Sequence, residues 1–562
     1  MGSILLFSAI GALVMAVIIT PFTIGKSDKE KSTGKLAEIA VAFVIFFVLS
    51  FIAIAIYYYV FNVDRNISSL WPFALAAALL GTTISTGLEQ KAKTLLAVAA
   101  VAGTAYIFAA PLFNAGEKFE SAEMKEEVEL EAFDETKTPA SVPPQFARNK
   151  MKKAFGQVPD TSYYELGNLQ IQKVNGEYVY IAPVEFSGFF KWWNADSTPG
   201  YFTMSATDAA ANPKFIQAEM IYTPSSYFGK NIERQMRMEN PEAVFYGEPQ
   251  LEVDEDGKPF YIRSYGDFIS ARDGFDVKGI VVVDPATGEN ENYALADVPA
   301  FIDGAVSPES VSLENSYYGN YANGFWNSKF GKKDVKLPSD EGTEANVSPI
   351  FDADGEMYYF TDFTSPKEGV DSMLGYSLTH ARTGESTFFT GSLDDSYMDS
   401  QGNLQIIEKQ FIEKQWSGKM PVLYNFYGEA SWLTPVLDSN GFLQNYFIVS
   451  AANPEISVFA NTPNEALRLY QTALQKGGSI VDNTSNAPQA ETAGTVERVF
   501  KEKTGDYTVV SFLLNDGSNY IVSSETNPLA IYLEAGDAVT VNYADTGEMF
   551  LPVKTLQIDA IE

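Results

Sequence analysis

Residues 37–61 read AEIAVAFVIFFVLSFIAIAIYYYVF, a run in which Glu38 is the only ionisable residue. A helix needs about 20 apolar residues to cross the roughly 30 Å hydrocarbon core of a bilayer. Similar runs lie at 4–24, 70–88 and 94–113, and none follows in the rest of the 562-residue chain. The sequence therefore predicts a four-helix transmembrane domain over 1–114 and a large water-facing portion over 115–562. The first run lacks a preceding basic residue, so we interpret it as a spanning helix rather than a signal peptide.

Lysine placement predicts the orientation of these helices. The loop 25–36 (GKSDKEKSTGKL) holds four lysines and the loop 89–93 holds two, whereas the loop between the second and third runs holds only Arg65. Cytoplasmic loops are enriched in Lys and Arg. We therefore expect both lysine-bearing loops in the cytoplasm and the bulk of the chain on the extracytoplasmic side. Aromatic residues at 57–61 and 71–73 fit the opposite, outer interface.

Composition narrows the possible partners and cofactors. The formal net charge is −33, which disfavours binding to the phosphate backbone of nucleic acids. The chain has no cysteine, which excludes disulfides, thiolate catalysis and cysteine-based zinc or iron–sulfur sites. We therefore expect a membrane protein with protein partners or a homo-oligomeric state, with no nucleic acid and no cofactor, apart from a candidate calcium site described below.

A recurring strand pattern occupies residues 161–475. In each copy an apolar strand, a glycine-bearing turn and an aromatic-rich return strand form a hairpin, and a third strand follows. The hairpins are LQIQKVNGEYVYIAPV (169–184), PQLEVDEDGKPFYIRSY (249–265), SPIFDADGEMYYFTDF (348–363) and MPVLYNFYGEASWLTPV (420–436). The third strands lie at 200–207, 277–289, 373–385 and 445–455. The pattern predicts a mainly antiparallel ectodomain built from four three-stranded units.

The segments on either side complete an α+β architecture. Residues 115–160 combine an acidic juxtamembrane helix or stalk with a proline-containing linker, and 476–490 (KGGSIVDNTSNAPQA) form a second linker. Residues 491–562 alternate apolar and polar positions in five short strands, which is typical of a small closed barrel of OB or SH3-like type. At residues 281–289 the phrase VVVDPATGE, echoed by SLTHARTGE at 377–385, resembles the strand–turn of PepSY-type domains of extracytoplasmic bacterial proteins. The whole chain also resembles large uncharacterised membrane-anchored proteins of bacteria and phages. The first resemblance implies a small helix-plus-sheet unit, the second implies topology, and neither supplies a catalytic residue.

Few residues qualify as site candidates. Asp254 and Asp256, and likewise Asp352 and Asp354, resemble the opening of a calcium loop, although hairpin turns explain the same residues and no terminal glutamate follows. The single histidine, His380, lies in a turn without the motifs of a catalytic triad. We therefore expect no catalytic residue and no cofactor-binding residue.

Two further patterns leave alternatives open. The aromatic run at 189–193 (FFKWW) is either core with one exposed edge or a carbohydrate or protein contact. Small residues at four-residue spacing, Ala74 and Ala78 in the third run and Ala99 and Gly103 in the fourth, indicate close helix packing, within the bundle or between copies.

Three functions fit these features. The first is a non-enzymatic membrane-anchored scaffold for self-assembly or partner binding. The second is an accessory subunit of a membrane channel or transport complex, although the apolar runs lack the buried ionisable residues that ion-coupled transport needs. The third is an extracytoplasmic carboxylate-based hydrolase or carbohydrate-binding protein, which needs two carboxylates facing each other in a cleft.

Overall fold

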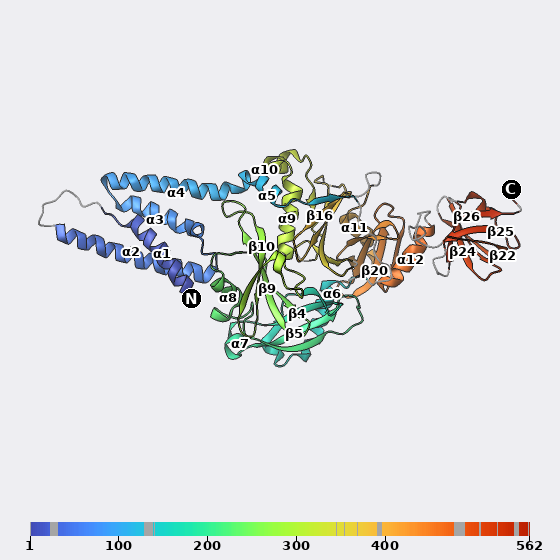
Figure 1. Cartoon of the computed structure of the whole chain (residues 1–562), viewed down its shortest axis with the longest axis horizontal. Helices are drawn as coiled ribbons and strands as arrows, with labels where there is room; N and C mark the ends of the chain where they lie inside the picture. Colours follow the sequence, from blue (N-terminus) through green and yellow to red (C-terminus); the bar gives the residue numbers. More distant parts are fainter. Residues whose placement is uncertain are drawn as a thin grey trace.

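The computed structural model describes residues 2–561 except 23–31, 129–138, 140, 344, 353, 368, 391–395, 477–488, 505–506, 525–526, 545–549 and 560. Figure 1 shows three parts in a row: apolar helices at one end, a body of β-sheets in the middle, and a β-barrel at the C-terminal end. This arrangement confirms the predicted mixed architecture with N-terminal apolar helices and a large sheet-rich portion.

Four helical segments are long and apolar enough to cross a membrane. They are α1 (Gly2–Ile19), α2 (Ser32–Phe61), the 3-10 turn η2 (Ile67–Leu70) continued by α3 (Trp71–Ile84), and α4 (Gly87–Phe113). Helix α1 packs against α2 and α3, and α3 packs against α4. Large apolar side chains such as Leu6, Leu49 and Phe108 remain exposed around the bundle. Such an apolar surface is typical of helices that contact lipid or the helices of other membrane proteins.

Small residues account for the closest helix contacts. A Cβ at Gly81 of α3 would lie 2.5 Å from the carbonyl oxygen of Ile18 in α1, so this crossing requires glycine. The predicted small residue Ala78 is buried on the same helix. By contrast, Ala99 and Gly103 of α4 are exposed. A Cβ at Gly103 would have no atom within 4 Å, so this position is not in a helix contact.

The lysines near residue 90 belong to a helix rather than to a loop. Because α4 begins at Gly87, the predicted loop 89–93 forms its first turns. Lys93 is buried, pairs with Glu89 at 2.8 Å, and donates from Nζ to the carbonyl oxygen of Thr20 at 2.6 Å. Glu89 also accepts the backbone N–H of Phe22 at 2.9 Å. The start of α4 therefore fastens the end of α1.

The juxtamembrane segment joins the sheet body directly. Helix α5 (Ala115–Ser121) continues from α4, and strand β1 (Lys125–Glu127) pairs in parallel with β16 (Ser386–Phe389). The segment predicted as a juxtamembrane stalk thus contributes an edge strand, β1, to a sheet. Residues 129–138 of this segment lie outside the described residues.

Four sheets in the body share one strand order. In each sheet, one edge of a long central strand pairs with two short strands, one after the other. Its other edge pairs with a further strand, and that strand pairs with the outermost strand of the sheet. The first sheet contains β2 (Tyr164–Leu166), β3 (Gln170–Val174), β4 (Glu177–Phe186), β5 (Thr198–Ser205) and β6 (Lys214–Met220). The second contains β7 (Val244–Phe245), β8 (Gln250–Val253), β9 (Pro259–Asp267), β10 (Asp276–Val283) and β11 (Asn290–Ala294). The third contains β12 (Leu337–Pro338), β13 (Ser348–Phe351), β14 (Met357–Thr364), β15 (Met373–His380) and β16, with β1 at its edge. The fourth contains β17 (Ser417–Gly418), β18 (Val422–Phe426), β19 (Glu429–Leu437), β20 (Leu443–Ser450) and β21 (Ser457–Ala460).

Each of the four predicted hairpins therefore lies in its own sheet, where it pairs antiparallel with the third strand predicted for it. The sequence pattern did not reveal the two outer strands of each sheet, because several are only two to five residues long. Helices pack between and beside the sheets, and they are α6 (Pro144–Ala154), α7 (Phe189–Asn194), α8 (Ile232–Glu239), α9 (Pro308–Tyr321), α10 (Gly324–Trp326), α11 (Ser400–Gln410) and α12 (Pro463–Lys476).

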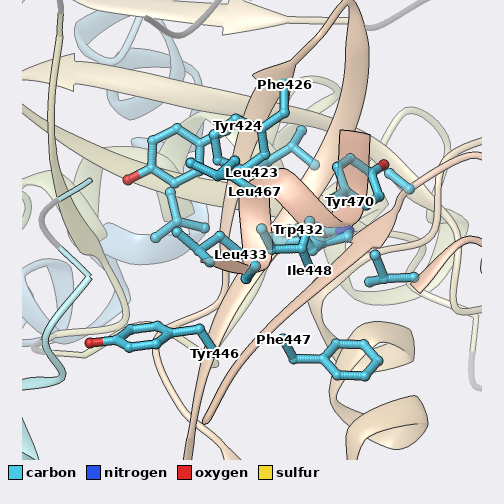
Figure 2. Packing of buried hydrophobic residues seen from close by; sticks show 14 of the residues in the cluster. Leu423, Tyr424, Phe426, Trp432, Leu433, Tyr446, Phe447, Ile448, Leu467 and Tyr470 are labelled. Carbon is cyan, nitrogen blue, oxygen red and sulfur yellow. The ribbon is translucent and has the colours of Figure 1, made fainter. Parts of the chain in front are cut away.

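The fourth sheet shows how the aromatic residues form the core. Trp432 of β19 is fully buried and donates from Nε1 to the carbonyl oxygen of Met398 at 2.9 Å. Tyr470 of α12 is also fully buried, and its hydroxyl accepts from the Ser431 hydroxyl at 2.8 Å. Figure 2 shows these rings packed with Phe447 and their neighbours. Burial of a large aromatic side chain contributes about 1.5–3 kcal/mol or more, so this cluster stabilises the sheet and its covering helix.

The C-terminal strands form a closed barrel in the order β22-β23-β24-β26-β25. They are β22 (Gln489–Thr504), β23 (Tyr507–Leu514), β24 (Asn519–Ser523), β25 (Ala538–Ala544) and β26 (Phe550–Ile558). The first half of β22 pairs with β25 and its second half with β23, while β24 and β26 pair in parallel. The five-stranded barrel predicted for this region is confirmed, and the preceding linker lies mostly outside the described residues.

Candidate functional site at the junction of the membrane helices and the sheets

Arginine is concentrated where the helices meet the sheets. The chain has nine arginines. Five of them lie at this junction: Arg65 between α2 and η2, Arg234 and Arg237 on α8, Arg263 on β9, and Arg272 in the loop after β9. In a chain of net charge −33, these five guanidinium groups make the junction locally rich in positive charge.

Hydrogen bonds to backbone atoms fix the two parts against each other. The N–H of Arg65 donates to the carbonyl oxygen of Pro241 at 2.7 Å. The side chain of Asn66 donates to the carbonyl oxygen of Glu242 at 2.9 Å. Both bonds join the turn between α2 and α3 to the segment after α8. The sheet body therefore sits directly on the ends of the helices.

A buried ion pair reinforces this contact. Arg272 donates from Nη2 to Asp64 Oδ1 at 2.7 Å and from Nη1 to Asp64 Oδ2 at 3.0 Å. Asp64 is 4% exposed, and the Arg272 side chain is 15% exposed. Two parallel N–H···O bonds fix orientation as well as distance. The pair thus joins a membrane loop to the sheet body in one geometry.

A cavity of about 530 Å³ lies behind these contacts. Its lining includes Arg237, which is buried, donates from Nε to the carbonyl oxygen of Asn62 at 3.2 Å, and lies 4.5 Å from the Phe245 ring. Burial lowers the pKa of the Arg237 guanidinium to about 9, while the Asp64 carboxylate opposes that shift. The hydrogen-bond acceptors of this side chain are carbonyl oxygens.

The carboxylates that line the cavity are already paired with cations. Asp64 binds Arg272, and Glu233 accepts from Arg263 Nη1 at 2.9 Å. Asp273 accepts from Lys118 Nζ at 2.7 Å and from the Asn114 side chain at 2.9 Å. Two of these pairs, Asp64–Arg272 and Asp273–Lys118, join the helices to the sheet body, whereas Glu233–Arg263 lies within the body. The sequence signal that could have revealed the joint was the clustering of arginines at 234–272.

The four aspartates proposed as calcium ligands lie in hairpin turns. Asp254 Oδ1 accepts the N–H groups of Asp256 at 3.0 Å and Lys258 at 2.8 Å. Asp352 Oδ1 accepts the N–H of Glu356 at 2.9 Å, and Asp354 is exposed. Among the described residues, no group of three or more His, Asp or Glu side chains is placed to hold a metal ion. The turns thus use one aspartate each to satisfy the backbone, and calcium binding stays a prediction.

His380 performs the same structural task as an aspartate elsewhere in the chain. Its Nδ1 accepts the N–H groups of Arg382 at 3.2 Å and Thr383 at 3.3 Å. In the β10–β11 turn, Asp284 Oδ1 accepts the N–H groups of Ala286 and Thr287 at 2.8 and 3.3 Å. The two turns that share the TGE phrase are therefore held alike, by a ring nitrogen in one and a carboxylate in the other.

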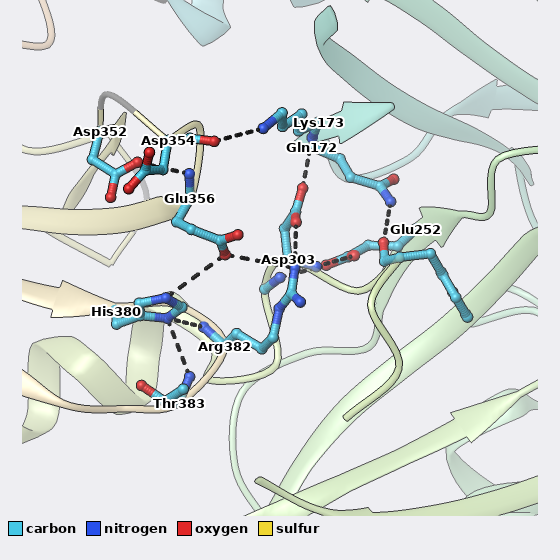
Figure 3. A network of polar contacts seen from close by, with 12 residues as sticks. Gln172, Lys173, Glu252, Asp303, Asp352, Asp354, Glu356, His380, Arg382 and Thr383 are labelled. Carbon is cyan, nitrogen blue, oxygen red and sulfur yellow. Dashed lines mark hydrogen bonds and ion pairs between the residues drawn. The ribbon is translucent and has the colours of Figure 1, made fainter. Parts of the chain in front are cut away.

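Next to His380, a buried polar network links three sheets (Figure 3). Glu252 of β8 accepts the backbone N–H groups of Asp303 and Gly304, both at 2.8 Å. Asp303 accepts the N–H of Lys173 at 2.6 Å and a bond from Arg382 at 3.1 Å. Burial raises the pKa of both carboxyl groups. The sequence signal was a glutamate inside the buried strand QLEV, and sequence reasoning did not use it.

The aromatic run at 189–193 divides between packing and exposure. Phe189 and Trp192 pack on Tyr227, with ring centroids 5.1 and 5.4 Å apart. Phe190 and Trp193 point to solvent and are 78% and 66% exposed. Helix α7 therefore places two large apolar side chains on the surface.

A second cavity, of about 760 Å³, lies beside the terminal barrel. It is lined mainly by β22, β23 and β24, including Arg498, Phe500 and Phe512, with Thr472 of α12 at its edge. Phe500 is 65% exposed. The groove combines apolar side chains with one basic and one acidic side chain, Arg498 and Glu497.

Comparisons with known proteins leave the family open. No protein-family model matches the chain, and no curated protein matches it. Among solved structures, a glycosyl hydrolase from Bacteroides ovatus aligns over 64% of this chain and 83% of its own, with 13% identity and a TM-score of 0.17. An alpha-L-arabinofuranosidase from Lactobacillus brevis aligns over 64% of this chain and 87% of its own, with 11% identity and a TM-score of 0.18. Scores this low assign neither fold family nor function.

Proposed function

We propose that this chain is a membrane-anchored structural protein that presents its sheet body and barrel for self-assembly or for binding to partner proteins. The junction is the observation that carries the proposal. Several arginines and a buried ion pair hold the body in one orientation against the helices. A fixed connection of this kind supports the scaffold role, because it gives the surfaces of the body one direction relative to the helices.

The bulk of the chain is proposed to lie on the extracytoplasmic side. Figure 1 shows that the N-terminus and the sheet body lie at the same end of the helices. The first turns of α2 and α4, which contain Lys35 and Lys91, lie at the other end. Because Lys is enriched in cytoplasmic loops, the lysines near that other end favour its location in the cytoplasm. Lys93 is neutralised by Glu89, so the lysines of 25–36 and Lys91 carry most of this inference.

The terminal barrel supports contact with proteins rather than with nucleic acid. Its closed strand order, with β24 and β26 parallel, fits an OB-type barrel. Single-strand binding needs a basic groove with stacking aromatics. The groove beside Phe500 has aromatics but only Arg498 as a cation, and the chain as a whole is acidic. A PepSY-like origin of the sheets is a hypothesis that rests on the TGE turns alone.

One alternative keeps a specific observation in its favour. Helices α2 and α4 lie at the two ends of the row α2-α1-α3-α4, and each leaves much of its apolar surface uncovered. Partner helices of a channel or transport complex could cover these faces. A carboxylate-based hydrolase is less well supported, because the carboxylates of the junction cavity are paired with cations.

Two measurements test the proposal. Because the chain has no cysteine, the variants Lys91→Cys and Ile412→Cys can be labelled singly on intact cells with a membrane-impermeant maleimide. We expect Ile412→Cys to react at once and Lys91→Cys to react only after permeabilisation. Mass measurement of the full chain extracted in native nanodiscs should then give a discrete homo-oligomer or a stoichiometric complex. A solitary monomer, or the reverse labelling pattern, would contradict the proposal.

A further inference from the structure

Two groups of exposed aromatic side chains lie on the end of the sheet body that faces the helices. The first consists of Phe190 and Trp193 on α7 with Phe228 on the adjoining 3-10 turn η5 (Phe228–Lys230), and these side chains are 48–78% exposed. The second consists of Trp326 on α10 and Phe330 on η7 (Asn327–Gly331), at 62% and 78%. In Figure 1, α7 lies below and α10 above the junction, at the same end of the body as α8.

The rings are held in place by other rings. Trp326 and Phe330 stack with centroids 5.9 Å apart and an interplanar angle of 12°. Phe228 packs against Trp192, which lies beneath the exposed face, at 5.7 Å. Each group is therefore a fixed platform whose outer surface is apolar.

Contacts place both groups at the level where the membrane helices end. Helix α10 packs against α4 and α5, next to the end of α4 at Phe113. The turn that carries Phe228 leads into α8, where the Arg234 guanidinium lies 4.2 Å from the Tyr59 ring of α2. Because α2 and α4 end at Phe61 and Phe113, both groups flank the bundle near the ends of its apolar helices. If these helices span a bilayer, this is the level of the lipid headgroups.

The chemistry of this level matches that of a membrane interface. Four of the six tryptophans in the chain lie here: Trp71, Trp192, Trp193 and Trp326. Lysines accompany both groups, among them Lys191, Lys230 and Lys329. Tryptophan and tyrosine are favoured at the interface, and lysines near the surface are attracted to anionic headgroups. The chain as a whole is strongly acidic, so attraction to anionic headgroups depends on local lysines such as these.

We propose that the Phe190–Trp193–Phe228 and Trp326–Phe330 groups insert into the interfacial layer of the lipid leaflet next to the body. The body then rests on the membrane on both sides of its anchor, so its tilt is restricted by lipid contacts as well as by the arginine junction. The occupant of these surfaces is lipid because the bilayer is the phase that the adjoining helix ends already contact. This inference goes beyond the proposed scaffold role and does not depend on which face of the membrane holds the body.

Spin labels on the otherwise cysteine-free chain test the proposal. Full-length Phe190→Cys, Phe330→Cys and Ile412→Cys are each labelled with a nitroxide and reconstituted in nanodiscs of phosphatidylcholine and phosphatidylglycerol. Collision rates are compared for oxygen, which concentrates in lipid, and for a water-soluble nickel chelate. Ile412 is the matched control, since it is 72% exposed and lies in the 3-10 turn that follows α11. Figure 1 shows α11 farther from the apolar helices than α7 and α10.

We expect the ratio of oxygen to nickel collisions to be several-fold higher at Phe190→Cys and Phe330→Cys than at Ile412→Cys. Equal ratios at all three positions would show that the aromatic groups face water and would overturn the proposal. Nickel exclusion accompanied by dipolar broadening between labels would identify a second copy of the chain as the occupant and would also overturn it. Neither result bears on the sidedness measured by maleimide labelling.

Discussion

Removal of the charge at Asp64 should loosen the joint between the membrane helices and the sheet body. In Asp64→Asn the amide oxygen can accept one of the two bonds from Arg272, but its NH₂ group faces the other guanidinium N–H. The buried guanidinium then lacks a counter-charge. Loss of one partner from a fully buried pair costs about 3–5 kcal/mol. Because Arg272 keeps some solvent contact and a bond to Ser68 at 3.1 Å, we expect about 2–3 kcal/mol here.

Hydrogen exchange at the junction measures this loss directly. The N–H of Arg65 crosses the junction to the carbonyl oxygen of Pro241, so its protection reports local opening. A decrease of 2–3 kcal/mol in the opening free energy corresponds to exchange roughly 30- to 150-fold faster. Mass spectrometry of peptides that cover 62–66 and 240–244, with the full chain in nanodiscs, gives the exchange rates of the native chain and of Asp64→Asn.

A surface ion pair supplies the matched control. Lys125 and Glu385 lie 3.4 Å apart and are both largely exposed, so Glu385→Gln should leave exchange at 62–66 unchanged. The reasoning fails if Asp64→Asn accelerates exchange no more than Glu385→Gln does. It also fails if the acceleration spreads evenly over all four sheets, because that result would indicate global unfolding rather than opening of the joint.

Four further changes test other parts of the structure. Burial, with a smaller contribution from the Asp276 carboxylate, raises the pKa of Glu314 on α9 from 4.5 to about 8. The protonated Glu314 therefore contributes fully to stability in acid, and this contribution is lost as pH rises from about 4.5 to 8. Glu314→Gln should match the native chain at pH 4.5 and exceed its unfolding free energy by about 2–4 kcal/mol at pH 8.5, measured by urea titration. His380→Ala should cost about 1 kcal/mol because two backbone N–H groups lose their acceptor, whereas His380→Asp should retain most of that stability in the same assay. Trp432→Ala should cost about 3–5 kcal/mol, and a loss below 1 kcal/mol would show that the fourth sheet does not depend on this core. Asp254→Asn keeps a side-chain oxygen as acceptor for the turn, so the variant and the native chain should have the same melting temperature, both with calcium and with a chelator. If calcium instead raises the melting temperature of the native chain and not that of the variant, the turn is a metal site.

Local sequence patterns were sufficient to predict the apolar helices, the four hairpins and the strands of the barrel. The apolar runs predicted the four helices that are long and apolar enough to span a membrane, because a bilayer requires about 20 apolar residues in a row. The hairpins were predictable because turns such as Asn175-Gly176 need positive φ angles, which are 52° and 81° here. Each turn fixes the register of its two strands, so β3–β4 and the three equivalent hairpins follow from sequence.

Contacts between distant segments were not predictable in this way. Strands β7, β12 and β17 are two residues long and exist only because a longer strand provides their hydrogen-bond partners. The junction depends on pairs such as Asp64 with Arg272, which lie 208 residues apart. Nothing in the local sequence of either residue identifies the other, since surface ion pairs and buried ones use the same residue types.

The distribution of the few basic residues connects the fold to its proposed role. A chain with 39 basic and 72 acidic residues has a body that anionic headgroups repel as a whole. The junction nevertheless holds most of the arginines, and lysines flank the aromatic groups on either side of it. Guanidinium groups fix direction through paired hydrogen bonds, as between Arg272 and Asp64. Local cations thus connect an acidic body to the apolar helices in one geometry, and the proposed scaffold role depends on that geometry.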